Sequence, residues 1–386
     1  MRNIIFLGLI SFFMDISSEM VYPIIPLYLT SAFGATPSLV GIIEGIAEST
    51  ASLLKVFSGY ITDKYKKKKP IAFIGYATGL LYKLALLFAS SWAGILAARV
   101  VDRLGKGIRT TPRDVMVSES ADKNAMGKSF GIHKAMDMAG SAIGIFLAYI
   151  LLKSIGNGEA DYRMIFIISV VPTILALIMF AFVRERKEPR EIKQREQFWS
   201  NISALDGRLK LYLLIIFLFT LGNSSNTFLL LRAKSAGFDD TNVILLYFLY
   251  NMTVSIFAIP FGKLSDRIGR KKVLTWGYLL FALVYGGFAI ATRPLAFVII
   301  FVLYGIFTAM TAGVERALIA EISPKELKGT MLGLHSTVAG IALLPASVIC
   351  GFLWDAFGSA VPFLFGAGMS LLAAVLLVLF FKNTEK

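Results

Sequence analysis

Long apolar segments separated by short polar loops run through the whole chain. Each is about twenty or more residues long, the length that an α-helix needs to cross a bilayer. The pattern predicts an all-α membrane protein with about twelve membrane helices, six before a long polar segment and six after it. The predicted helices cover residues 4–33, 39–60, 70–90, 91–119, 126–153, 163–183, 211–234, 241–261, 272–292, 294–321, 329–356 and 360–381.

The long polar segment, residues 184–210, predicts a cytoplasmic connector between a first six-helix bundle, residues 1–183, and a second, residues 211–386. Two of the short loops are rich in lysine and arginine, and membrane proteins keep such loops in the cytoplasm. We therefore expect a multi-pass protein of the inner or plasma membrane with both termini in the cytoplasm. The first apolar segment lacks a cleavage pattern, which indicates a membrane helix rather than a removed signal peptide.

Composition agrees with a membrane protein, because only 17% of the 386 residues are charged, against about a quarter in soluble proteins. The net charge of +14 could indicate nucleic-acid binding, but basic cytoplasmic loops account for it. We expect the lipid bilayer and no nucleic acid as a partner. One cysteine and two histidines give little basis for a metal site. No phosphate-binding loop or nucleophile–base pair is present, so we expect no enzyme activity, no cofactor and a monomer.

The two halves repeat each other at an offset of about 200 residues. Gly59 and Asp63 match Gly262 and Asp266, and the only two histidines of the chain occupy matching positions. A fixed offset between two six-helix halves predicts two pseudo-symmetric bundles related by an axis along the membrane normal.

The segment that begins at Gly262, GKLSDRIGRKK, resembles the loop signature G-x-L-x-D-R-x-G-R-K-x of the major facilitator superfamily of secondary transporters. The chain looks like this family over its whole length. The resemblance implies a midplane cavity, alternating access and a gating role for Asp63 and Asp266. Arg99 resembles the arginine of the family's motif R-x-x-x-G-x-G, although Arg103 replaces its first glycine. The fifth predicted helix lacks the proline that drug/proton antiporters carry there, which argues against such an antiporter.

A charged stripe lies within the fourth predicted helix. Its members share one helical face and are Arg99, Asp102, Arg103, Lys106, Arg109, Thr110 and Arg113. Ionisable groups at bilayer depth must face protein or a water-filled cavity. The excess of basic residues predicts an anionic or zwitterionic substrate, bound by Arg99 and Arg103. We expect Lys106, Arg109 and Arg113 to be used in ion pairs.

Acidic residues of neighbouring predicted helices are the expected partners of this stripe. The candidates are Asp15, Glu19, Glu44, Glu48 and Asp137. A desolvated, loosely paired carboxylate can exchange a proton near neutral pH. These five residues are therefore predicted to couple transport to protons, with Glu19 and Glu48 foremost.

The second half is uncharged at the matching positions. The second half instead offers amide and phenol side chains, which are those of Asn223, Asn226, Tyr247 and Asn251. We predict that these residues, together with Tyr22 of the first half, bind an apolar or hydrogen-bonding part of the substrate. Residues near the predicted cytoplasmic ends are expected to act in gating, in addition to the two loop aspartates. They are Arg113, Glu315, Arg316, His133 and His335.

These observations favour secondary active transport of a small, anionic or zwitterionic solute, coupled to protons. Three alternatives stay open. The first is a multidrug/proton antiporter that exports cationic or amphiphilic compounds. The second is a transporter-like receptor or lipid scramblase without a coupled gradient. The third is a metal or metal-chelate transporter that uses His133 and methionines, which are also common at helix packing faces.

Overall fold

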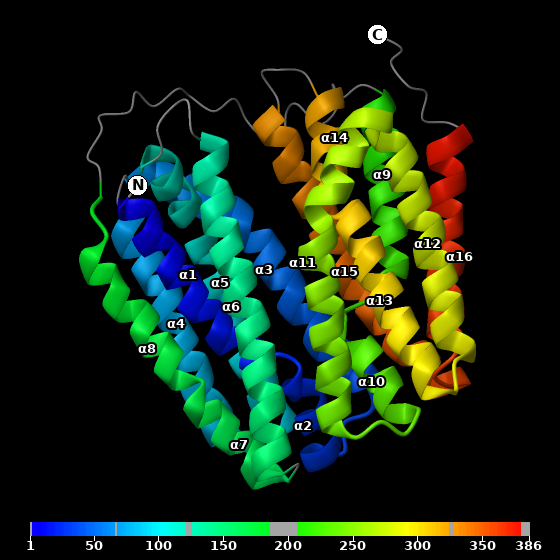
Figure 1. Cartoon of the computed structure of the whole chain (residues 1–386), viewed down its shortest axis with the longest axis horizontal. Helices are drawn as coiled ribbons and strands as arrows, with labels where there is room; N and C mark the ends of the chain where they lie inside the picture. The colour runs from blue at the N-terminus through cyan, green and yellow to red at the C-terminus, as the bar shows by residue number, and fades with distance from the viewer. Residues whose placement is uncertain are drawn as a thin grey trace. The chain divides into compact units, whose positions relative to one another are not determined.

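A computed structural model describes residues 2–65, 68–120, 126–156, 158–185, 207–323 and 328–379. All regular elements of these residues are helices (Figure 1). The side chain of Asp63 and most of the predicted connector, residues 184–210, lie outside the described part.

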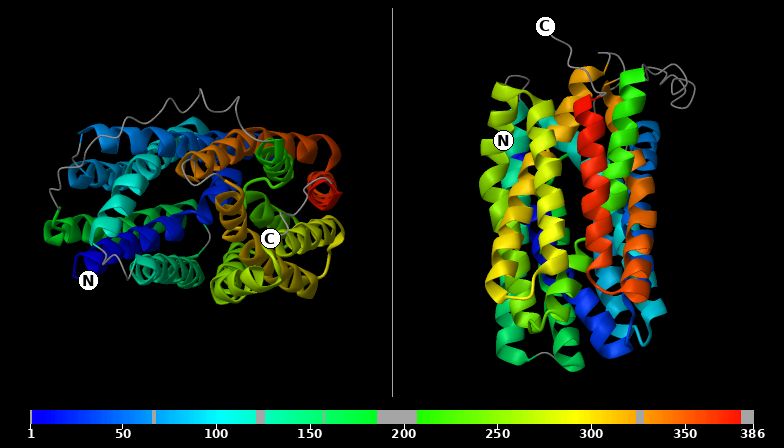
Figure 2. Two further views of the ribbon diagram at one scale, coloured as in Figure 1. Left: turned by 90° about the horizontal axis from the view of Figure 1, so that it is seen from above. Right: turned by 90° about the vertical axis from the view of Figure 1, so that its right-hand side faces the viewer.

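The helices of the first half follow the predicted order. They are α1 (Arg2–Val21), α2 (Ile24–Phe33), α3 (Pro37–Tyr65), α4 (Lys68–Phe88), α5 (Trp92–Ser120), α6 (Met126–Ile155), α7 (Glu159–Ile168) and α8 (Val170–Met179). Those of the second half are α9 (Gly207–Gly222), α10 (Thr227–Ser235), α11 (Asp240–Ile268), α12 (Arg270–Ile290), α13 (Pro294–Thr311), α14 (Val314–Ile322), α15 (Lys328–Phe357) and α16 (Val361–Leu379). In each half the membrane-length helices run alongside one another (Figures 1 and 2).

Four of the twelve predicted helices are broken, each into two helices. The first breaks between Val21 and Ile24, where Pro23 precedes α2, and proline has no backbone N–H to continue the helical hydrogen bonds. The seventh breaks after Gly222 within the polar run NSSN, whose side chains compete with the backbone for hydrogen bonds. The other two breaks separate α7 from α8 and α13 from α14. The breaks of the first and seventh helices occupy equivalent places in the two halves, whereas those of the sixth and tenth do not.

In the described part of the chain, ten helices or joined helix pairs are long and apolar enough to cross a membrane. The remaining two, α3 and α5, have 29 residues each, and both carry charged residues in their central turns. The chain is thus a multi-pass membrane protein whose polar groups are concentrated on two helices.

The chain forms two compact units. The first comprises Met1–Thr36, Ile46–Ile192 and Asp239–Phe248, and the second comprises Pro37–Gly45, Lys193–Phe238 and Leu249–Lys386. The first turns of α3 therefore belong to the second unit, and the first turns of α11 belong to the first. Apart from these two matching segments, the described residues of each unit come from one predicted bundle.

Within the first unit, α1 and α6 approach each other through glycines. A Cβ atom at Gly140 would lie 2.4 Å from the carbonyl oxygen of Phe12, and one at Gly144 would lie 2.5 Å from that of Ile16. Small residues allow membrane helices to pack backbone against backbone. This close approach fixes the acidic face of α1 beside α6.

We expect Gly144→Ala to destabilise the protein by about 1–3 kcal/mol, because the added methyl group overlaps rigid backbone. Thermal unfolding of the purified protein in detergent measures the effect. Gly368→Ala in α16 is the matched control, since no heavy atom lies within 4 Å of its Cβ position. Equal unfolding temperatures of the two variants would contradict this view of the α1–α6 contact.

Candidate functional site

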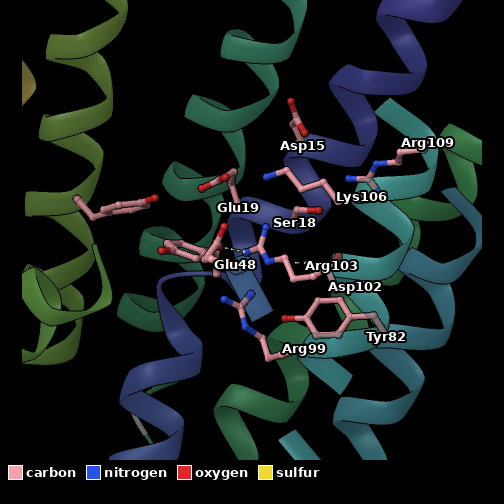
Figure 3. A pocket seen from close by; sticks show the side chains of 12 residues that line it. Asp15, Ser18, Glu19, Glu48, Tyr82, Arg99, Asp102, Arg103, Lys106 and Arg109 are labelled. Carbon is pink, nitrogen blue, oxygen red and sulfur yellow. Dashed lines mark ion pairs between the residues drawn. The ribbon is translucent and has the colours of Figure 1, made fainter. Parts of the chain in front are cut away.

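A cavity of about 200 Å³ lies inside the first unit, and most of its lining is polar or charged (Figure 3). Its walls come from α1, α3, α4, α5 and the first turns of α11. The lining residues are Asp15, Ser18, Glu19, Tyr22, Glu48, Tyr82, Arg99, Asp102, Arg103, Lys106, Arg109 and Tyr247.

Helical spacing explains why α1 and α5 supply most of the lining. Each contributes residues three or four positions apart, which lie on one face of a helix. The flank of α5 that carries Gly105, about a quarter turn from the charged face, packs closely against α4. A Cβ atom at Gly105 would lie 2.7 Å from the carbonyl oxygen of Gly75. Because this flank is occupied by α4, α5 turns its charged face toward the cavity.

Arg103 forms ion pairs with two carboxylates of the cavity. Its Nη2 atom lies 3.0 Å from Oε1 of Glu48, and its Nε atom lies 3.7 Å from Oδ2 of Asp102. The side chain is 5% exposed. Its guanidinium carbon and that of Arg99 lie 5.9 and 5.3 Å from the ring centroid of Tyr22, within the range of cation–π attraction.

Other charged groups of the cavity have unused hydrogen-bonding capacity within the described residues. One carboxylate oxygen of Glu19 and one guanidinium nitrogen of Arg109 are buried without a hydrogen-bond partner. The Arg109 guanidinium instead stacks 4.8 Å from the ring centroid of Tyr76. Lys106 is exposed to solvent and forms no ion pair in the described part of the chain.

The basic residues that form ion pairs differ from those predicted to do so. Lys106 and Arg109 were predicted to pair, but among the described residues neither forms an ion pair, whereas Arg103 does. The reason is positional, because Glu48 of α3 meets α5 at the level of Arg103, one helical turn before Lys106. Arg113 does pair, with Asp114 at 2.9 Å.

The formal charges of the lining balance, with four carboxylates and four cations. A further cation, Lys83, is completely buried next to Tyr82, and its amine has no hydrogen-bond partner in the described part of the chain. Sequence reasoning overlooked Tyr82 as a lining residue. Its position beside a lysine inside an apolar helix is the signal that could have found it.

Tyr247 is the one lining residue that the second half of the sequence supplies. Its ring lies 5.8 Å from that of Tyr22, centroid to centroid. The amides predicted to act with it belong to the second unit and do not line this cavity. Asn226 accepts a 2.8 Å hydrogen bond from the hydroxyl of Tyr304, and Asn223 and Asn251 lie in the same unit.

Glu44 also lies apart from the cavity. It is 1% exposed and belongs to the second unit, where the hydroxyl of Ser225 donates a 3.4 Å hydrogen bond to it. The acids of α3 therefore occupy different units, although they are only one helical turn apart. Of the five acids predicted to couple protons, Asp15, Glu19 and Glu48 line the cavity.

The residues predicted to act in gating form separate clusters. In the first unit, His133 lies 3.8 Å from Asp137 and 3.0 Å from Ser11. In the second unit, the hydroxyl of Tyr278 donates a 3.1 Å hydrogen bond to Glu315, which lies 3.8 Å from His335.

Two further gating candidates lie at the surface: Arg316 is exposed, and Asp266 lies 3.4 Å from Arg270. Their gating roles remain predictions. Among the described residues, no group of three or more His, Cys, Asp and Glu side chains could hold a metal ion.

The sequence profile of the Major Facilitator Superfamily matches residues 7–239 and, in a second match, residues 211–386. The chain belongs to the major facilitator superfamily. It is 39% identical over 383 residues to an uncharacterized MFS-type transporter of Methanocaldococcus jannaschii, which covers 98% of this chain and 94% of that protein. Members of the superfamily are transporters rather than enzymes, so this chain is a transporter with a small-molecule substrate.

Two further proteins show how far the similarity extends. The multi-drug resistance efflux pump PmrA of Streptococcus pneumoniae is 30% identical over 132 residues, 34% of this chain and 33% of its own length. A crystal structure of a mutant nucleoside transporter NupG superposes with a TM-score of 0.84 at 12% identity, covering 98% of this chain and 100% of that one. The structural likeness shows the fold of twelve helices.

Proposed function

We propose that this superfamily member moves a small anionic or zwitterionic solute together with a proton, by alternating access. We place it in the inner or plasma membrane with both termini in the cytoplasm. The observation that carries the proposal is the balanced charge of the cavity, where four carboxylates face four cations.

The size of the cavity favours a small solute. Its volume of about 200 Å³ is below the range of about 300–1,000 Å³ that is typical of sites for drug-sized ligands. Charged groups dominate the lining, and buried charges are costly unless they are paired. A compact solute with one or two charged groups would satisfy them, whereas a large apolar drug would not.

The charge balance links the solute to a proton. When all eight lining groups are charged, the wall is neutral, and an added anion would leave an uncompensated negative charge. A proton on one carboxylate gives the wall one positive charge, and a monovalent anion then restores neutrality. Proton and anion therefore favour each other's binding, and thermodynamic linkage makes this coupling reciprocal.

Arg103 is the residue through which this coupling acts. Its guanidinium is paired with Glu48 at 3.0 Å and with Asp102 at 3.7 Å, and a proton on Glu48 would remove the shorter of the two pairs. The Nη side of the guanidinium can then bind a carboxylate or phosphate. Lys106, which forms no ion pair within the described residues, supplies a second positive charge. In a zwitterionic solute, the amine would face Asp15 and Glu19.

The test is a ligand-stabilisation screen of the purified protein at acidic and at neutral pH. The compounds are small monocarboxylates, dicarboxylates, phosphate, amino acids and the cationic drug ethidium. We expect small anions or zwitterions to raise the unfolding temperature, more so at acidic pH, since a ligand at 100 times its Kd stabilises by about 2.7 kcal/mol. Glu19→Gln and Glu48→Gln should lose the pH dependence.

Stabilisation by ethidium alone would replace the proposal with its main competitor, a multidrug/proton antiporter. The local similarity to PmrA is the observation that favours this competitor, and the cavity acids would then bind the cationic drug. If ligand stabilisation depends neither on pH nor on the two glutamine substitutions, the proposed proton coupling is wrong.

A further inference from the structure

A second polar network lies in the first unit, next to the charged cavity, and is centred on the hydroxyl of Ser11. The Ser11 oxygen lies 3.0 Å from Nε2 of His133 and 3.2 Å from the hydroxyl oxygen of Tyr76. Arg113 donates a 3.4 Å hydrogen bond to it from Nη1. Ser11 and His133 are 2% and 4% exposed. The four groups come from four helices, α1, α6, α4 and α5.

One helical turn leads from this network to cavity-lining residues on α1 and α5, and to Asp137 on α6. Asp15 follows Ser11 by four residues on α1, and Asp137 follows His133 by four on α6. A step of four residues is about 6 Å along a helix. Asp15 lines the cavity, and its charge interacts with that of Asp137. On α5 the corresponding step leads from Arg113 to Arg109, which also lines the cavity.

Asp137 lies between the Ser11 network and the level of Asp15. Its Oδ1 atom lies 3.8 Å from Nδ1 of His133 and is buried without a hydrogen-bond partner in the described residues. The distance is too long for a direct hydrogen bond, and one water molecule or a small side-chain rotation would close it. A buried carboxylate oxygen beside an imidazole is suited to accept a proton from it.

The other end of the network reaches a second cavity. Arg113 pairs with Asp114 at 2.9 Å, and the side chain of Asp114 is 45% exposed. Asp114 lines an open cavity of about 280 Å³ together with Thr111, Val115, Ser118 and Glu119. Buried polar groups therefore run from one cavity of the first unit to the other.

We propose that His133 passes protons between the two cavities, through the Ser11 hydroxyl on one side and Asp137 and Asp15 on the other. This proposal rests on the proton coupling proposed above and adds the route by which the proton arrives. Histidine is suited to the task because one ring nitrogen can accept a proton while the other releases one.

The transfer conserves every proton. A hydronium ion that enters from the open cavity beside Asp114 gives a proton to the Ser11 oxygen, which passes its own proton to Nε2 of His133. The Arg113 guanidinium stays protonated throughout and only orients the Ser11 oxygen. The imidazolium then releases the proton on Nδ1 to Asp137, and the ring is left neutral as the other tautomer. Asp137 passes the proton to Asp15 at the cavity wall. No bond between heavy atoms forms or breaks, and no electron changes place.

Several charged or titratable groups act on His133 from the surrounding helices. They are Ser11 on α1, Arg113 and Asp114 on α5, and Lys134 and Asp137 on α6 itself. Tyr76 on α4 reaches His133 only through Ser11, and Asp15 on α1 only through Asp137.

The second unit supplies a matched control. His335 occupies the repeat position of His133, is similarly buried at 7% exposure, and lies 3.8 Å from Glu315. Neither of the two cavities includes a residue of the His335 cluster. Loss of His335 therefore removes the same side chain from a similar environment without interrupting the proposed route.

The experiment needs no substrate. Purified protein is subjected to a rapid drop in pH, and infrared absorption follows the rate at which buried carboxylates gain protons. We expect His133→Asn to slow this rate by about a hundredfold, the lower end of the effects typical of a positioned proton-transfer group. His335→Asn should match the unsubstituted protein. Equal rates in all three proteins would overturn the proposal.

A second measurement guards against a folding defect. Because the chain has two histidines, histidine-selective isotope labelling gives two sets of ring signals in NMR. We expect Asp137→Asn to change the pH at which His133 titrates by about one unit, with Asp137→Glu restoring it. The His335 signals report on the intact fold. If the pH at which His133 titrates is the same in Asp137→Asn as in the unsubstituted protein, the proposed route is also wrong.

The two proposals can fail separately. Anion binding without pH dependence, together with slowed proton entry in His133→Asn, would refute the coupling at Glu19 and Glu48 and support the route. Normal proton entry in His133→Asn, together with pH-dependent binding, would refute the route and leave the coupling intact.

Discussion

Arg103→Ala abolishes the binding of small anions and destabilises the protein by about 3–5 kcal/mol, the usual effect of removing one partner of a buried ion pair. Two carboxylates depend on this guanidinium, Glu48 at 3.0 Å and Asp102 at 3.7 Å. Without it both would lose their ion-pair partner, and the cavity wall would carry a net negative charge that repels an incoming anion. Thermal unfolding and anion-induced stabilisation of the purified variant measure the two effects.

Two further variants separate stability from binding. Arg103→Ala combined with Glu48→Gln should recover much of the stability, because the uncompensated carboxylate is gone, but it should not recover anion binding. Arg270→Ala is the matched control. Arg270 also bridges two acids, Asp266 and Glu321, but its side chain is 28% exposed, so its loss should cost no more than about 1 kcal/mol. Unchanged anion binding by Arg103→Ala would contradict its assigned role.

Glu19→Gln makes anion binding independent of pH. If one proton is taken up with each anion, the affinity of the unsubstituted protein should rise by up to about tenfold for each pH unit of acidification. Glutamine cannot ionise, and it leaves the cavity wall with one positive charge at every pH. The variant should therefore bind anions at neutral pH as the unsubstituted protein does at acidic pH. Affinity measured over a pH series records this slope.

Glu159→Gln is the control for this substitution. Glu159 pairs with Arg163 at 3.0 Å, is 53% exposed and does not line the cavity. Its loss should leave the pH dependence of binding unchanged. The coupling role of Glu19 would be wrong if Glu19→Gln kept the full slope, or if Glu159→Gln removed it to the same degree.

Helical periodicity was sufficient to predict much of the candidate site. Asp15 and Glu19 share a face of α1, with Tyr22 directly after its last turn, and Arg99 and Arg103 share a face of α5. All five line the cavity. The reason is local, since a regular helix converts sequence spacing into direction. The fold was predictable for the same reason, because apolar segments of bilayer length can only be helices or barrel strands.

What the sequence did not reveal depends on where helices meet. Glu44 and Glu48 have equivalent patterns on α3, but they belong to different units. The pairing of Arg103, in place of Lys106, follows from the level at which α3 meets α5. Neither fact is encoded in the spacing along one helix. Pro23 is a signal for the break between Val21 and Ile24, but the prediction of a continuous helix over residues 4–33 did not use it and was wrong.

The central claim is that solute and proton bind together in the charged cavity. Its most direct test is calorimetric titration of the purified transporter, at one pH, with the anion that stabilises it best. The titration is repeated in two buffers whose heats of ionisation differ, and the difference in binding heat gives the number of protons taken up per anion. The account predicts uptake of about one proton, lost in Glu19→Gln, because one protonated carboxylate balances one bound anion. Identical heats in both buffers would contradict it.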